Sequence, residues 1–158
     1  MRLILLLAVW LAATAGHANH TVDHSVQEIV EESYVVWGGR MGEVPTIKIV
    51  ATAEFDQSVC RRSCPKFIVA AYRNGAIYLR DQWDPSDVWQ ASYLVHEMIH
   101  HLQDQAGMHP ANPSCEDAWR LELQAYELQN RWLLQYQKMI PRTMMMHMIA
   151  ASTGCSPH

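Results

Sequence analysis

The residues best suited to chemistry in this sequence are the two histidines and the glutamate of His96-Glu97-Met98-Ile99-His100. On a helix, residues four apart lie one turn above each other, so these two imidazoles emerge on one face about 40° apart. Two neutral imidazoles at this spacing can bind one Zn²⁺ ion, and Glu97, about 100° round from His96, can contact a metal-bound water. Such an ion needs one further protein ligand and one position left for water.

The surrounding sequence supplies the helix that this spacing requires. Asp84-Pro85-Ser86-Asp87 predicts its start, with Asp84 as the N-cap, and Gly107 predicts its end. The apolar residues of this helix cluster between about 200° and 300° from His96 on a helical wheel. They are Ala91, Val95, Met98, Ile99 and Leu102. The histidine pair therefore borders the face that we expect to be buried.

A second helix follows, and it carries three glutamates that could complete a metal site. Ser114 and Asp117 form a capping box at its start, and the helical pattern continues to about Met139, before Pro141. If the two helices form an antiparallel pair, residues equally far from the connecting turn lie side by side. The glutamates on the second helix are Glu116, Glu122 and Glu127.

Distance from the turn separates these glutamates. The midpoint of the histidine pair lies about 14 Å before the end of the first helix, and Glu122 lies about 12 Å after the start of the second. Glu116 would lie near the turn, and Glu127 would overshoot the histidines by more than a helical turn. Glu122 also shares a face with aromatic and small residues, where an unpaired buried carboxylate is costly. We therefore predict Glu122 as the third ligand.

The remaining histidines and two tyrosines are weaker candidates. His101 points about 140° away from His96, which favours a solvated or supporting role over ligation. The methionines on either side of His147 are most simply core residues of a last helix. Four side chains could donate a hydrogen bond to an oxyanion, although packing or surface roles are favoured for each. They are His109, His147, Tyr126 and Tyr93.

The N-terminus predicts export. Met1-Arg2 precedes the apolar run Leu3–Ala13 and a small-residue cleavage region, which together are typical of a signal peptide over residues 1–18. Residues 19–158 are enough for one domain, and no later stretch is long enough to span a bilayer. We therefore expect a periplasmic or secreted protein. The net charge of −4 and the lack of a basic stripe argue against a nucleic-acid partner.

The cysteines agree with an oxidising compartment. Cys60, Cys64, Cys115 and Cys155 form an even set, for which three pairings are possible. We favour Cys60–Cys64 together with Cys115–Cys155. The second bond would close a loop of about 40 residues and could contribute roughly 4 kcal/mol on the chain-entropy model.

The other elements predict an α+β fold. Helical periodicity covers Asp23–Trp37 and Arg142–Thr153, and alternation predicts a strand over Pro45–Thr52. Two apolar runs, Phe67–Tyr72 and Ala76–Leu79, flank an Asn-Gly pair that is typical of a hairpin turn. We expect a small antiparallel or mixed sheet packed on an antiparallel pair of long helices, with further helices at both ends.

With His96, Glu97, His100 and Glu122 assigned, the chain resembles the gluzincin branch of the zincin metallopeptidases. In that family H-E-x-x-H is followed by a glutamate ligand on the next helix, often as E-x-x-A, and Glu122-Leu123-Gln124-Ala125 matches this pattern. The resemblance covers about 45 residues, from Ser86 to about Arg131. The metzincin branch is a poorer match, because Gln103 and Ala106 replace its glycine and third histidine.

The chain departs from the gluzincin pattern at one position. Many gluzincins carry an aspartate four residues after the glutamate ligand, where it orients a histidine, and here that residue is Tyr126. Another side chain must then hold the imidazoles, since such outer partners tune metal affinity. Asp104 and Asp117 are the candidates.

The resemblance implies a zincin-like, zinc-dependent peptidase that acts on peptides or proteins, and we expect a monomer. Zinc would acidify its bound water, and Glu97 would take the proton and pass it to the leaving amine. The strand Ala76–Arg80 is expected to be the sheet edge that pairs with an extended substrate. Two alternatives stay open: an exported zinc-binding module without turnover, binding partners or acting like a chaperone, and a disulfide-stabilised interaction protein without metal.

Overall fold

The structure is a computed structural model that describes residues 25–60 and 64–155, and in this part the chain has the α+β composition that the sequence predicts. The predicted signal peptide lies outside the described residues. The elements, in chain order, are α1 (Val26–Trp37), β1 (Thr46–Val50), α2 (Thr52–Val59), β2 (Ala70–Arg73), β3 (Ala76–Arg80), α3 (Val88–Gln105), α4 (Cys115–Leu133), the short 3₁₀ helix η1 (Leu134–Tyr136) and α5 (Arg142–Thr153).

The sheet is mixed, with strand order β1-β3-β2. β2 and β3 form the predicted hairpin, and its turn residues Asn74 and Gly75 have φ values of 51° and 77°. Asn and Gly tolerate these positive values better than other residues, which is why this pair predicts the turn. β1 lies parallel to β3 on the other side.

The expectation that Ala76–Arg80 forms the sheet edge is wrong. This segment is β3, which pairs with β1 on one side and with β2 on the other. Because both of its sides are occupied, β3 has no free row of backbone groups for a substrate. The edges of this sheet are β1 and β2, and β2 is the edge strand that contacts α3.

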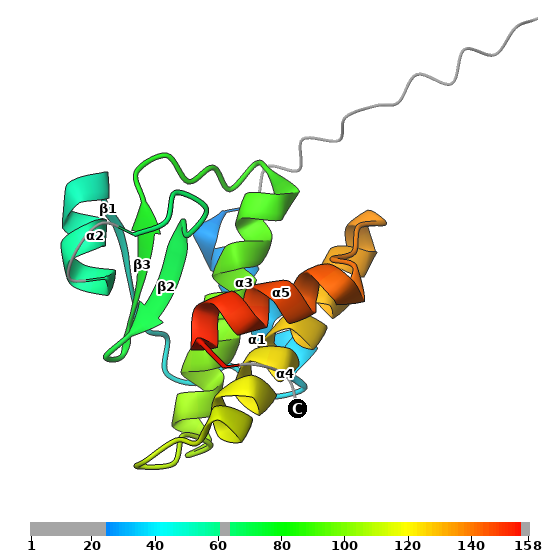
Figure 1. The fold of residues 1–158 in the computed structure, drawn as a ribbon. Coiled ribbons are helices and arrows are strands. Elements are labelled where there is room, and N and C mark those ends of the chain that lie inside the picture. Colours follow the sequence, from blue (N-terminus) through cyan, green and yellow to red (C-terminus); the bar gives the residue numbers. More distant parts are fainter. Residues whose placement is uncertain (1–24, 61–63, 156–158) are drawn as a thin grey trace, which may run out of the picture.

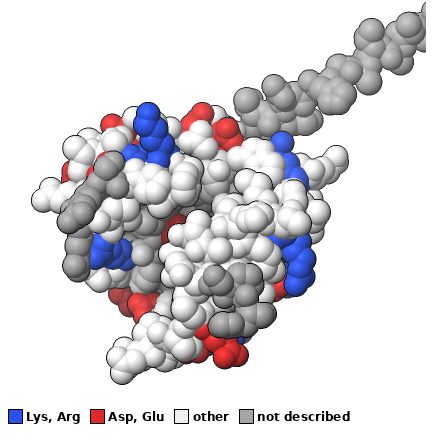
Figure 2. Space-filling view, in the orientation of Figure 1, with Lys and Arg blue, Asp and Glu red and all other residues white. Residues whose placement is uncertain are grey.

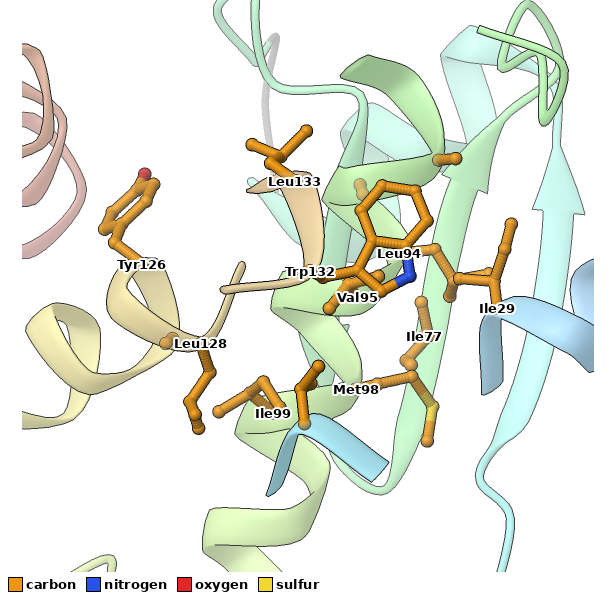
Figure 3. Packing of buried hydrophobic residues seen from close by; sticks show 14 of the residues in the cluster. Ile29, Ile77, Leu94, Val95, Met98, Ile99, Tyr126, Leu128, Trp132 and Leu133 are labelled. Atoms are coloured by element: carbon orange, nitrogen blue, oxygen red, sulfur yellow. The ribbon is translucent and has the colours of Figure 1, made fainter. Parts of the chain in front are cut away.

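α3 lies at the centre of the molecule. Figure 1 shows α2 on one side of the sheet, α1 and α3 on the other, and α4 and α5 beyond them. Successive side chains of β3 point to opposite faces of the sheet. Ile77 and Leu79 join the main core, and Tyr78 packs against the smaller cluster beneath α2. Figure 3 shows Leu94 and Met98 of α3 in the main core with Ile77, and all three are fully buried. α3 is therefore held from several sides, which makes it a rigid support.

The two long helices form the predicted pair, with differences at their ends. α3 begins after Asp87, whose side chain accepts hydrogen bonds from the N–H groups of Trp89 and Gln90. Asp84, predicted as the N-cap, instead accepts from Ser86 in the turn before the helix. The two aspartates have similar capping chemistry, so composition alone did not separate them.

α4 begins with the predicted capping box, in which Ser114 and Asp117 each accept a hydrogen bond from the other's backbone N–H. It ends at Leu133 instead of about Met139, and the chain continues through one 3₁₀ turn to Gln137, which has a positive φ of 56°. The last predicted helix, Arg142–Thr153, matches α5, which ends before Gly154. The sequence did not predict α2, a short helix whose one buried residue is Phe55.

Both favoured disulfides are present. Cys60 is bonded to Cys64, and Cys115 at the start of α4 is bonded to Cys155 just after α5. Bonds of this kind are typical of oxidising compartments, so they are consistent with an exported protein. Within the described residues, no helix is both long and apolar enough to cross a membrane.

Candidate metal centre

The structure brings together the three residues that the sequence predicts as ligands. His96 and His100 project from α3, and Glu122 projects from the adjacent α4. Glu122 oxygens lie 3.3 Å from His96 Nε2 and 3.6 Å from His100 Nε2. One candidate ligand atom from each residue falls within 4.8 Å of the others. Glu116 and Glu127 are exposed and belong to no such group in the described residues.

Two buried glutamines hold the imidazoles. His96 Nδ1 lies 3.1 Å from Gln129 Oε1, and His100 Nδ1 lies 2.9 Å from Gln103 Oε1. The two aspartates proposed for this role act elsewhere: Asp104 accepts a hydrogen bond from the Tyr72 hydroxyl, and Asp117 caps α4. That expectation is therefore wrong, because amides and not carboxylates contact the rings.

The bonds of Gln103 fix the tautomer of His100. Gln103 Nε2 donates to the Leu121 carbonyl oxygen at 2.9 Å and to Gln124 Oε1 at 3.0 Å. A backbone carbonyl can only accept, so the orientation of this amide is determined, and Oε1 is the atom that faces His100. His100 Nδ1 must then carry the proton, which leaves the lone pair of a neutral ring at Nε2.

The same reasoning holds for His96. The Ser92 hydroxyl donates its one hydrogen to the Trp89 carbonyl oxygen, so it can only accept from Gln129 Nε2, 2.8 Å away. Gln129 Oε1 therefore accepts from His96 Nδ1. In the neutral forms of both rings, the lone pair lies at Nε2.

The lone pairs and the carboxylate converge on one place. The two Nε2 atoms are 3.1 Å apart, and they face the Glu122 carboxylate. Glu122 Oε2 is buried, and none of the described residues donates a hydrogen bond to it. A group that consists of acceptors alone is repulsive unless a cation lies among them. Two imidazoles and a carboxylate are also a common ligand set of catalytic zinc, so these residues fit the ion that the resemblance implies.

The histidines and Glu122 also shift each other's pKa. Burial by itself lowers the pKa of His100, but the hydrogen bond and charge of Glu122, the charge of Glu97 and the Gln103 amide raise it to about 9. Burial opposes the ionisation of Glu122, yet the adjacent imidazoles of His100 and His96 hold its pKa well below the usual value. A proton on His100 thus balances the carboxylate when no metal ion is bound.

Glu97 lies beside this group on the sheet side of α3. Its Oε2 accepts a hydrogen bond of 2.6 Å from the backbone N–H of Tyr72 in β2. Its charge acts on both His100 and Tyr126, so the carboxylate is close to the ligand cluster. Figure 2 shows a recess between the sheet side of the molecule and α5, with acidic atoms at its floor.

The other predicted candidates do not join the ligand group. His101 is buried on another face of α3, where its Nε2 lies 2.8 Å from the Glu43 carbonyl oxygen. His109 and His147 are exposed, and Tyr93 is half-buried. Tyr126 packs on the His96 ring with centroids 4.3 Å apart. Burial and the charges of Glu122, Glu97 and Tyr93 raise the pKa of Tyr126, so its hydroxyl stays protonated.

Sequence reasoning missed the roles of Gln103, Gln129 and Ser92. The sequence did contain a signal for them: each is a polar residue beside predicted apolar positions of a helix, and a buried polar side chain needs hydrogen-bond partners. Spacing could not identify the partner of each residue. Gln129, for example, contacts His96 on the opposite helix, 33 residues away in the chain.

Residues 37–158 match the family model described as "Domain of unknown function (DUF6647)", and this segment includes all of the residues that form the candidate metal centre. No curated protein and no solved structure matches the chain.

Proposed function

We propose that this chain, which belongs to the DUF6647 family, is an exported zinc-dependent peptidase of the zincin type. The observation that carries the proposal is the convergence of His96, His100 and Glu122 with both imidazole lone pairs at Nε2. The two disulfides support export to the periplasm or the outside of the cell.

Zinc fits this group better than magnesium or calcium does. Magnesium and calcium favour all-oxygen ligand sets, whereas two imidazoles and one carboxylate suit a catalytic zinc with an open position. His96, His100 and Glu122 would hold the ion. When bound, it would supply Lewis acidity that polarises a substrate carbonyl and acidifies a water molecule.

Glu97 is the residue that would move protons. One of its oxygens accepts from the Tyr72 N–H, which fixes the carboxylate while the other oxygen can accept the proton of the attacking water. Glu97 would then deliver this proton to the amine that leaves when the peptide bond breaks. The short bond to backbone matters because a general base must be held within hydrogen-bond reach of its proton.

The edge strand β2 favours an extended peptide as the substrate. The Tyr72 N–H points away from β3 towards Glu97, so the outer side of β2 runs beside the proposed catalytic carboxylate. Edge strands can pair with extended peptides through main-chain hydrogen bonds, and β2 has a strand on one side only. Peptide hydrolysis is therefore favoured over hydrolysis of a small molecule that has no backbone to align.

The proposal is tested by two measurements on the purified, oxidised chain. Elemental analysis measures the zinc content, and a peptide library measures cleavage by the wild type, by Glu97→Gln and by Glu127→Gln. We expect Glu97→Gln to keep its zinc and to lose cleavage by about 10²–10⁴-fold, the usual contribution of a general base. Glu127 is an exposed glutamate on α4, so Glu127→Gln serves as the matched control and should cleave normally.

Each contrary result selects another function. A zinc-loaded protein whose cleavage does not depend on Glu97 would be a metal-binding module without turnover. A protein that takes up no zinc, and whose melting ignores chelator, would be a disulfide-stabilised interaction protein.

A further inference from the structure

We infer that Gln103 and Gln129 are positioning residues of the metal centre: each fixes the metal-binding tautomer of one histidine with a neutral amide. This inference rests on the proposed metal site. It goes beyond the gluzincin resemblance, in which an aspartate has this task and Tyr126 stands in its place.

The two amides form a reciprocal pair of bridges between the ligand-bearing helices. Gln103 starts on α3, contacts His100 on the same helix and reaches the Leu121 carbonyl oxygen on α4, one residue before Glu122. Gln129 starts on α4 and reaches His96 and Ser92 on α3. Each bridge therefore ties a histidine to the helix that carries the glutamate ligand, which fixes the relative position of all three ligands.

Both glutamines are buried, so their hydrogen bonds are needed for the stability of the fold. Gln103 and Gln129 have no exposed surface, and a buried amide destabilises the fold unless its hydrogen bonds are made. In both residues the oxygen accepts from an imidazole and the nitrogen donates to a group on the opposite helix. Apolar side chains would fill the same space without this requirement, so the hydrogen bond to the imidazole is what a polar side chain adds at each position.

The amides add no charge to a site that already contains two carboxylates. Glu122 and Glu97 together carry two negative charges, which balance one divalent cation. Carboxylates at positions 103 and 129 would orient the rings equally well but would add charge to a largely buried site, where uncompensated charge is costly. Amides orient the imidazoles and leave this balance unchanged.

Zinc affinity, measured by competition with a chromophoric chelator, tests the inference without any activity assay. We expect Gln129→Met and Gln103→Met to bind zinc about 10–100-fold more weakly than the wild type, the usual effect of removing an outer partner of a ligating histidine. Gln105→Met is the matched control, because Gln105 is an exposed glutamine of α3 whose amide donates to the Glu43 carbonyl oxygen and not to a ligand histidine. It should bind zinc like the wild type.

A rescue variant separates positioning from packing. Gln129→Glu restores an acceptor for His96 Nδ1, and the Ser92 hydroxyl can rotate from the Trp89 carbonyl oxygen to donate to its second oxygen. We therefore expect this variant to bind zinc at least tenfold more tightly than Gln129→Met. If the amide only filled space, the two variants would be equal. Nuclear magnetic resonance of the zinc-loaded wild type, with ¹⁵N in its imidazoles, should show Nδ1 protonated in both His96 and His100.

The outcomes distinguish this inference from the proposed function. A wild type that binds no zinc would overturn the proposed function. A wild type that binds zinc, together with Met variants that bind it equally well or rings that bind it through Nδ1, would overturn only the role of the glutamines.

Discussion

Two buried polar clusters in this molecule differ in a way that separates structure from function. Beneath α2, Arg80 of β3 forms an ion pair of 2.9 Å with Asp56. It also donates to the Ile68 carbonyl oxygen at 2.8 Å and stacks over the Phe55 ring at 4.6 Å. The cation there meets an anion, an acceptor and an aromatic face, so the cluster is complete without any other component.

The cluster between α3 and α4 is incomplete by the same standard. Its two Nε2 atoms and the Glu122 carboxylate are all acceptors in the neutral state of the rings, and Glu122 Oε2 has no hydrogen-bond partner in the part of the chain that the structure describes. The Arg80 cluster shows that this fold can satisfy a buried charge with its own residues. A group that consists of acceptors whenever its rings are neutral therefore indicates a place for a cation, either a proton or a metal ion, and not poor packing.

The largest expected effect tests the claim that the Arg80 cluster is purely structural. Asp56→Ala leaves the buried Arg80 guanidinium without its anion, which should lower the free energy of unfolding by roughly 3–5 kcal/mol. Urea denaturation, with and without zinc, measures this loss. It should be the same in both conditions, whereas Asp81→Ala, which removes an exposed carboxylate, should change little. A loss that depended on zinc would contradict the separation of the two clusters.

The pH dependence of the zinc-free protein tests the claim that a proton stands in for the metal ion. The pKa of His100 is raised from 6.5 to about 9, so its contribution to stability is complete below pH 6.5 and is lost as the pH rises towards 9. This loss should reach roughly 3 kcal/mol. The lowered pKa of Glu122 acts in the other direction, since its contribution is present above pH 4.5 and is lost as the pH falls.

Thermal and urea unfolding of the zinc-free chain between pH 4 and 9.5 should therefore show a maximum of stability between about pH 4.5 and 6.5. His100→Gln should remove the decline on the alkaline side. If the decline persisted in that variant, the proton would not be shared within the ligand group.

The smallest expected effect is the stabilisation by zinc itself. At a free zinc concentration of 100 times Kd, binding to the folded state alone should add about 2.7 kcal/mol to the free energy of unfolding. Glu122→Gln should lose most of this gain, because it replaces an anionic ligand with a neutral one. Asp56→Ala should keep the whole gain despite its lower stability. Equal zinc stabilisation of Glu122→Gln and the wild type would remove Glu122 from the site.

Much of the site could be predicted because its signals are local. The spacing of His96 and His100 fixes their common helix face, and the Ser114 capping box fixes where α4 begins. Those two facts were enough to place Glu122 level with the histidines. The errors in the fold arose where local signals were degenerate, as in the choice of Asp87 over Asp84 as the N-cap of α3.

Other features could not be predicted from local sequence. The sequence of β3 resembles that of any half-buried strand. Its central place depends on the parallel pairing with β1, in which Thr46 lies opposite Ala76, 30 residues later in the chain. The partners of the imidazoles were missed for a related reason. A glutamine within an amphipathic helix has no charge that marks it, so its role becomes visible only when the opposite helix is in place.

The sequence by itself determined the chemistry of the ligands, because residue type and the helical period decide which ligand side chains share a helix face. Tertiary structure alone decided the strand order, the amides that orient the rings and the hydrogen bond from Tyr72 to Glu97. These depend on contacts between segments that are far apart in the chain. Such contacts form only when the whole core packs, and no local propensity encodes them.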